Sequence, residues 1–275
     1  MTPKITDLLG LFGTRKPVIG VVHLPPLPGS PLCRQSLEEL VERALKDAET
    51  LEEGGIDGVL VENYGDKPFR KKVGPETIAT MSIIVEKVVK SLSIPVGVNI
   101  LRSDCLAALA VASVTGARFI RCNVFTDTLV TDQGIIEPCA WELMSYRRML
   151  GSRVMIFADI LCKHAKPLVE LSPEESARNA AYRGMADAII LTGRETGLGP
   201  DPRYVERVRK AVPDVPLLIG SGFTPENAEI LLKFSDGAIV GTYLKRGGVT
   251  EECVDLDRVR KLMSVVKELR RLETE

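Results

Sequence analysis

Residues 215–245 read VPLLIGSGFTPENAEILLKFSDGAIVGTYLK, and this stretch holds two short apolar runs, 217–220 and 238–240, separated by an amphipathic segment. The first run ends at Gly220, and the second is followed directly by Gly241. Short apolar runs that alternate with amphipathic segments are typical of βα units around a buried parallel sheet. We therefore predict a strand, a helix and a second strand here, with a glycine turn after each strand.

The same alternation continues along the whole chain. Six further apolar runs lie at 18–22, 58–62, 96–99, 119–123, 154–159 and 188–191. The two halves of the chain also resemble each other. GIDGVL at 55–60 matches MADAII at 185–190, and IPVGVN at 94–99 matches VPLLIG at 215–220. Eight such units favour an α/β fold that closes into a (β/α)₈ barrel, and the alternative is an open, doubly wound sheet.

Length and chain ends fit one domain. A barrel of this kind typically needs about 250 residues, and this chain has 275. We expect residues 1–275 to form a single barrel domain. Within it, 1–15 would be an N-terminal extension or capping helix and 255–272 the closing helix.

The predicted helices have recognisable ends. A hydroxyl residue stands three positions before a carboxylate in two capping boxes, and a Thr-Pro pair marks a third start. These starts are Ser36 with Glu39, Ser172 with Glu175, and Thr224-Pro225. Glycines that can adopt a left-handed conformation mark the helix ends. These glycines are Gly54-Gly55, Gly116 and Gly184.

Charge and composition exclude several classes of function. The chain carries 36 Lys and Arg against 37 Asp and Glu, so no overall field favours nucleic acid or an anionic membrane. Its apolar stretches are far shorter than the roughly 18 residues of a membrane span, and residues 1–12 lack the pattern of a signal peptide. We expect a cytoplasmic protein without nucleic-acid partners or a transmembrane segment. The sequence leaves a homo-oligomer open.

Cysteines and histidines give no metal pattern. The six cysteines form no C-x-x-C pair, so we interpret them as free thiols of a reduced compartment that pack as small hydrophobes. The two histidines, His23 and His164, lack the spacing of a zinc site. We predict no metal and no cofactor, with Mg²⁺ held by Glu62 and Asp159 as the alternative.

The turns after the last two strands suggest an anion site. In (β/α)₈ barrels these turns and a short extra helix commonly bind phosphate, because glycines let backbone N–H groups approach and a helix N-terminus adds partial positive charge. The chain also offers nearby hydroxyls and a glycine after the sixth strand. The alternative is that the glycines only make tight turns. The predicted phosphate-binding residues are Thr192, Gly193, Gly220, Ser221, Gly222, Gly241 and Thr242.

Polar residues at the ends of several strands are candidates for chemistry. Strand ends point into the mouth of a barrel, where catalytic residues gather. Asp159 is the first candidate for a general acid or base because it ends a buried apolar run, and Glu62 is the second. We expect Lys163 to pair with Asp159 or to bind a substrate anion, with a Schiff-base role less favoured. Each charge could instead form a structural salt bridge. The candidate catalytic residues are His23, Glu62, Asn99, Asn123, Asp159 and Lys163.

Three loops are long enough to cover the mouth. Residues 23–35 are rich in proline, residues 125–138 contain an Asp-Gln-Gly turn signal that predicts a small hairpin, and residues 193–202 contain several glycines. Closure over a ligand is a natural role for such loops.

Four stretches carry a family resemblance: VVHLPPLPGS at 21–30, GVLVENY at 58–64, ADILCKHAK at 158–166 and TGRETG at 192–197. On these motifs the chain resembles the BtpA family, named for a cyanobacterial factor needed for photosystem I biogenesis, over about 15–270. The resemblance implies a barrel similar to the ribulose-phosphate-binding group. Related sequences occur in organisms without photosynthesis and in a sugar-metabolism operon, so the photosystem role is not general. The family supplies no settled reaction, and no catalytic residue is carried over.

Two functions follow from these observations. The first is an enzyme of the isomerase, lyase or hydrolase class that acts on a phosphorylated sugar or related anionic metabolite. The second is a non-catalytic biogenesis or assembly factor that works through protein partners. A polar mouth without a ligand costs free energy, because each unpaired buried polar group is worth about 1 to 3 kcal/mol, so the enzyme is the favoured hypothesis.

Overall fold

Eight parallel strands hydrogen-bond in a closed ring in the order β1, β11, β10, β9, β7, β4, β3, β2. The computed structural model describes residues 5–193 and 199–272. Every predicted strand is present within two residues, and ring closure confirms the barrel over the open sheet. The barrel strands are β1 (Val18–His23), β2 (Gly58–Glu62), β3 (Val96–Asn99), β4 (Phe119–Cys122), β7 (Met155–Ile160), β9 (Ala188–Leu191), β10 (Leu217–Ile219) and β11 (Gly237–Val240).

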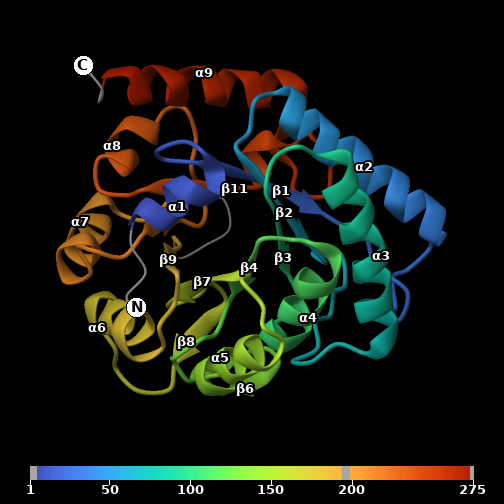
Figure 1. The fold of residues 1–275 in the computed structure, drawn as a ribbon, viewed down its shortest axis with the longest axis horizontal. Helices are drawn as coiled ribbons and strands as arrows, with labels where there is room; N and C mark the ends of the chain where they lie inside the picture. Colours follow the sequence, from blue (N-terminus) through green and yellow to red (C-terminus); the bar gives the residue numbers. More distant parts are fainter. Residues whose placement is uncertain (1–4, 194–198, 273–275) are drawn as a thin grey trace.

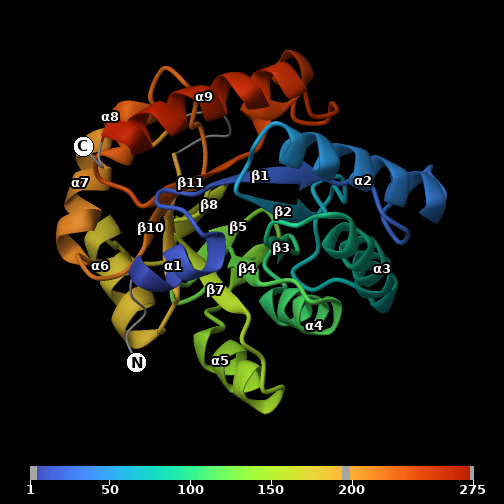
Figure 2. The same cartoon turned by 45° about the horizontal axis from the view of Figure 1, so that its top comes forward.

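Helices surround the strands (Figure 1). They are α2 (Leu37–Glu53), α3 (Pro75–Ser91), α4 (Cys105–Thr115), α5 (Ala140–Met149), α6 (Pro173–Arg178), α7 (Pro202–Ala211), α8 (Ala228–Leu232) and α9 (Leu256–Leu272). A π-helical turn, η1 (Asn179–Arg183), continues α6, and two 3₁₀ turns, η2 (Thr242–Leu244) and η3 (Arg246–Gly248), follow β11. The turned view in Figure 2 shows α9 along the outside of the barrel, between α8 and α2.

The predicted helix starts agree with the structure at two of three places. Ser36 Oγ accepts the Glu39 N–H at 3.2 Å and the Glu39 carboxylate accepts the Ser36 N–H at 2.7 Å, a complete capping box on α2. Ser172 caps α6 with its hydroxyl. The start expected at Thr224 is three residues too early, because Asn227 Oδ1 accepts the Thr224 N–H at 2.9 Å and α8 begins only at Ala228.

The helix ends also differ at one place. Gly55 and Gly116 are left-handed, with φ of 88° and 86°, as predicted. Gly184 has φ −81°, and the left-handed residue there is Met185, with φ 60°. A Cβ atom at position 184 would lie 2.5 Å from the Phe125 ring. Close packing, and not a left-handed turn, therefore requires this glycine.

Side chains fill the barrel interior. Large apolar residues from the strands pack there, and Phe119 stacks on Phe157 with ring centroids 4.9 Å apart. Helix α1 (Ile5–Phe12) lies across the end of the barrel where the strands begin, with Leu8 and Phe12 buried in the same cluster. Helix α1 therefore closes this end of the barrel, and the cavity described below lies at the opposite end.

A small sheet lies beside that open end. Strands β5 (Leu129–Thr131) and β6 (Gly134–Ile136) form the hairpin predicted within 125–138, and β8 (Ala165–Pro167) pairs with β5. The hairpin is thus tied to the segment that follows β7. Of the other two predicted loops, 23–35 is tied by the Leu27 N–H to Asp66 at 2.7 Å, and 194–198 lie outside the described residues.

Within 5–193 and 199–272, none of the helices is long and apolar enough to cross a bilayer.

Candidate functional site

A cavity of about 590 Å³ opens at the carboxyl ends of the strands. Its wall combines residues of β1, β2, β4 and β7 with the turns after β10 and β11. Asn99, Thr192 and Gly193 are predicted site residues that do not line it. The predicted residues that do are His23, Glu62, Asn123, Asp159, Lys163, Gly220, Ser221, Gly222, Gly241 and Thr242. The fold therefore brings most of the predicted set around one space.

One wall consists of three residues in register on adjacent strands. His23 on β1 lies opposite Glu62 on β2, and Glu62 lies opposite Asn99 on β3. Asn99 Nδ2 donates to Glu62 Oε2 at 2.5 Å, and Glu62 Oε1 is 3.7 Å from His23 Nε2. Asn99 thus stands behind Glu62 and orients its carboxylate.

The imidazole of His23 is neutral. Burial, together with the positive charges of Lys245 and Lys163, holds the pKa of His23 well below its usual range. A Cβ atom at Gly241 would lie 2.6 Å from the His23 ring, so the glycine makes room for the imidazole. Tyr64 covers the ring at a centroid distance of 4.7 Å.

Asp159 is held by an arginine rather than by Lys163. The Arg121 guanidinium donates to both carboxylate oxygens of Asp159, and Asn123 Nδ2 donates to Oδ2 at 2.8 Å. Burial opposes the charge of Arg121, but the Asp159 and Glu62 carboxylates outweigh it and raise the pKa of the guanidinium. Asp159 and Lys163 form no ion pair within the described residues, so the alternative in which Lys163 pairs with Asp159 is wrong.

The Arg121 guanidinium also affects the binding of Mg²⁺ that was considered as an alternative. Arg121 interacts electrostatically with both Asp159 and Glu62, which are the two carboxylates considered as magnesium ligands. A cation that acts on both carboxylates opposes the binding of a second cation there.

Lys163 presents an amine that no described residue pairs with. Its Nζ atom makes no ion pair or hydrogen bond within the described ranges. Burial, with the nearby Arg121 charge, lowers the pKa of Lys163 from 10.5 to about 8. At neutral pH most of the lysine is charged, yet a useful fraction is a free base.

Backbone geometry fixes Lys163 at the mouth. Leu161 and His164 flank it with φ of 47° and 54°, values that are costly for residues other than glycine. The Arg102 guanidinium donates to the Lys163 carbonyl and to Cys162 Sγ. Arg102 therefore holds the turn that carries the amine.

Two of the predicted phosphate-binding amides are already used. The Gly220 N–H donates to the Leu191 carbonyl at 2.8 Å, and the Gly193 N–H donates to Ser221 Oγ at 3.1 Å. A Cβ atom at Gly220 would lie 2.4 Å from Ile190, so packing requires this glycine. Neither Gly193 nor Gly220 can offer its amide to a ligand in this arrangement, which corrects that part of the expectation.

Four other backbone N–H groups at the cavity have no hydrogen-bond partner among the described residues. No hydrogen bond among the described residues uses the N–H groups of Gly222, Phe223, Thr242 and Tyr243. All four residues line the cavity. Gly222 and Thr242 were among the predicted residues, and the structure adds the neighbouring amides of Phe223 and Tyr243.

Two cationic cavity residues, Lys67 and Arg258, were not singled out from the sequence. Arg258, near the start of α9, donates to the Tyr243 carbonyl at 2.5 Å, with its guanidinium 4.5 Å from the Tyr243 ring. Lys67 lies 4.1 Å over the Tyr64 ring. Arg258 could have been anticipated, because the first turn of the closing helix follows the eighth strand and so begins at the mouth.

The chain is similar to known proteins over nearly its full length. Residues 14–268 match the model of the BtpA family. A protein of Archaeoglobus fulgidus is 47% identical over 92% of this chain and 99% of its own. The photosystem I biogenesis protein BtpA of a Synechocystis species is 43% identical over 95% of this chain and 92% of its own.

Solved structures share the fold at low identity. The native KDPGal structure superposes with a TM-score of 0.55 at 14% identity, over 94% of this chain and 96% of the other. The N-(5'-phosphoribosyl)anthranilate isomerase from Pyrococcus furiosus gives 0.54 at 16% identity, over 92% and 99%. These likenesses identify the (β/α)₈ barrel.

Proposed function

The chain belongs to the BtpA family, and from that premise we propose that it is an enzyme of the isomerase or lyase class acting on a small phosphorylated sugar or related anionic metabolite. The observation that carries the proposal is the charge of the cavity wall. Among the described residues, five cationic side chains line it against two carboxylates, an excess of three positive charges when the lysines are protonated. They are Lys67, Arg102, Arg121, Lys163 and Arg258, against Glu62 and Asp159.

The anion would bind on the side of the β10 and β11 turns. The unused amides of Gly222 and Thr242 face the cavity there, and Arg258 adds a full positive charge. Hydrogen bonds to ionised groups are about twice as strong as neutral ones. A phosphate would thus receive both directed N–H groups and charge. The isomerase from Pyrococcus furiosus, which shares the fold, is named for a phosphoribosyl substrate, and this supports the same substrate class.

Proton transfer would take place on the opposite side. Lys163 supplies an amine with a pKa of about 8, close to the operating pH where a general acid or base works best. Glu62, positioned by Asn99, supplies a carboxylate acceptor. In this proposal Asp159 is a positioning residue, because its oxygens hold Arg121 and Asn123.

Ligand binding tests the proposal. Thermal shift and calorimetry would compare sugar phosphates with the same sugars lacking phosphate. Phosphorylated compounds should stabilise the wild type, by about 2.7 kcal/mol at a hundredfold excess over Kd. Ser221→Asp keeps an acceptor for the Gly193 N–H but adds negative charge beside the proposed phosphate, so it should weaken binding about tenfold or more.

Ser264→Asp is the matched control. Ser264 is exposed on α9 and does not line the cavity, so the same added charge should leave binding unchanged. If no phosphorylated compound stabilises the wild type, or if Ser221→Asp binds as tightly as Ser264→Asp, the phosphate proposal fails.

An assembly role is the second candidate, favoured by two exposed apolar side chains of one helix. Trp141 is 77% exposed and Met149 73% exposed on α5, and a protein partner would remove both from water. The Synechocystis relative is named for photosystem I biogenesis. In a cyanobacterium lacking that relative, the double variant Trp141→Ser and Met149→Ser should fail to restore photosystem I if this role applies, while Lys163→Met should restore it. The reverse result favours the enzyme.

A further inference from the structure

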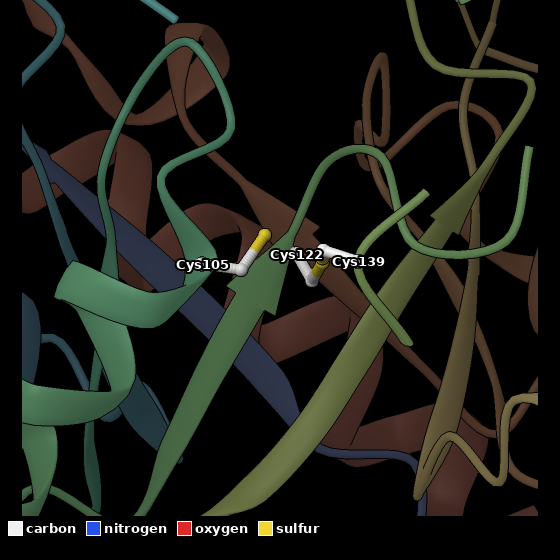
Figure 3. Close-up of side chains that lie close together, drawn as sticks. All are labelled: Cys105, Cys122 and Cys139. Atoms are coloured by element: carbon white, nitrogen blue, oxygen red, sulfur yellow. The ribbon is translucent and has the colours of Figure 1, made fainter. Parts of the chain in front are cut away.

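Three cysteines far apart in the sequence meet behind the cavity wall. Figure 3 shows Cys105 at the start of α4, Cys122 at the end of β4 and Cys139 on the segment that leads into α5. Their Sγ atoms all lie within 4.8 Å of one another. The Cys122 and Cys139 Sγ atoms are 3.6 Å apart. Cys105 and Cys122 are buried, and Cys139 is partly exposed.

This spacing is close to that of a thiolate metal site. Zinc binds sulfur at about 2.3 Å, which places the sulfurs of a tetrahedral site about 3.8 Å apart. The three Sγ atoms need shift by only about 1 Å at most to reach that arrangement. The Val124 carbonyl lies against the same atoms, 3.4 Å from Cys122 Sγ and 3.3 Å from Cys139 Sγ. This carbonyl oxygen, or a water, would be the fourth ligand of the metal.

Charge favours a divalent ion. Three thiolates with a divalent cation leave one negative charge, whereas a monovalent cation leaves two, and buried net charge is costly. Among the described residues, no lysine or arginine forms a hydrogen bond to these three sulfurs. Glu142 and Asp104 lie close enough to Cys139 to act on it electrostatically. Their negative charge adds to the attraction for a cation.

We propose that Cys105, Cys122 and Cys139 form a structural site for a thiophilic divalent cation of the zinc type. The ion would join α4, the end of β4 and the segment before α5. Binding releases the protons of the thiols to solvent, because the thiolate is the ligand. No electron transfer is involved.

The site would act on the cavity through the chain on either side of Cys122. Arg121 precedes it and Asn123 follows it, and both donate to Asp159. Arg102, which holds the turn carrying Lys163, lies three residues before Cys105. A metal at the three sulfurs would therefore stiffen the wall of the cavity from behind without touching a ligand.

Direct metal binding tests this inference. Full-length protein, reduced and stripped with a chelator, would be titrated with Zn²⁺ and, for spectroscopy, with Co²⁺ and Cd²⁺. We expect one equivalent of Zn²⁺ per chain, a rise in Tm, and sulfur-to-metal charge-transfer absorption with Co²⁺ and Cd²⁺. Cys105→Ser, Cys122→Ser and Cys139→Ser should each weaken binding by at least about 100-fold, the upper end of what changes around a metal site's ligands cost.

Cys253→Ser is the matched control, because Cys253 is also partly buried but lies outside the cluster. It should bind Zn²⁺ like the wild type. Should a buried variant fail to fold, thiol alkylation of the wild type gives the answer: Zn²⁺ should protect Cys139 and leave Cys33 and Cys253 reactive. Absence of stoichiometric uptake, uptake that survives the cluster substitutions, or a Cys122–Cys139 disulfide formed in place of metal binding overturns the proposal.

Discussion

Arg121 and Asp159 face each other from neighbouring strands, and the guanidinium donates three hydrogen bonds of 3.1 to 3.2 Å to the two carboxylate oxygens. The side chain of Asp159 is 1% exposed and that of Arg121 11%. A buried pair with this geometry is worth little by itself against an apolar pair of the same volume, but removing one partner leaves an uncompensated charge. The pair therefore acts as a rigid unit of the cavity wall.

Asp159→Asn should lower the free energy of unfolding by about 3 to 5 kcal/mol, because Arg121 loses its counter-charge while buried. Urea denaturation would measure this. The double variant Arg121→Met with Asp159→Leu, which removes both charges, should recover most of the loss. A single variant as stable as the wild type would contradict this account.

Lys163 should react with acylating reagents at lower pH than the other lysines. Its neutral fraction reaches one half near pH 8, since burial lowers its pKa to about 8, whereas an ordinary lysine reaches that point above pH 10. Mass spectrometry of briefly labelled protein would show Lys163 modified first, with its rate rising through pH 8. Bound sugar phosphate should protect it. A labelling rate that matches exposed Lys87 at every pH would contradict the shift.

The same shift predicts a pH effect on stability. The folded chain releases the Lys163 proton near pH 8 and the unfolded chain near 10.5. Between these values the unfolded state binds more protons, so this lysine makes the free energy of unfolding rise with pH. Urea titrations from pH 8 to 10.5 should show a smaller rise in Lys163→Met than in the wild type. Equal slopes would show that the lysine titrates normally.

Phe12→Ala should cost about 3 kcal/mol or more, because it empties the end of the barrel core. Phe12 is 9% exposed and packs edge-on against Phe119 at 5.7 Å. Leu9 on the same helix is 39% exposed, so Leu9→Ala should cost much less. Urea denaturation distinguishes the two, and equal costs would mean that α1 does not seal the barrel.

A buried lysine anchors the turn after β11. Lys245 is fully buried, and its Nζ lies 3.2 Å from Asp47 on α2. Lys245→Met should lower the free energy of unfolding by about 3 kcal/mol or more, because Asp47 stays buried with a weaker partner. Arg43, whose side chain is 27% exposed, is the other cation at Asp47, and Arg43→Met should cost about 1 kcal/mol or less. Of these two variants, only Lys245→Met should weaken phosphate binding. Lys245 anchors the turn after β11, and this turn contains the Thr242 amide proposed to bind the phosphate.

Local patterns in the sequence predicted the strands and most helix ends, and the number of units favoured the barrel. Apolar runs predicted every barrel strand, and the Ser36 capping box appeared as expected, because strand and helix signals depend on neighbours within about four residues. The same logic put His23, Glu62 and Asp159 at one mouth, since the carboxyl ends of parallel strands in a barrel share one edge. The resemblance to the BtpA family, carried by contiguous motifs, was likewise readable from the chain alone.

Only the tertiary structure decided which of these groups touch. Asp159 bonds to Arg121, 38 positions earlier in the chain, because β4 and β7 are neighbours in the barrel. It does not bond to Lys163, four positions later, because the turn after β7 places the lysine elsewhere. The Gly220 amide is used by Leu191 because β9 and β10 are also neighbours. Cys105, Cys122 and Cys139 show no metal spacing in sequence, yet a helix, a strand and a loop bring their sulfurs together. Contacts between elements depend on packing across the barrel, which no local pattern encodes.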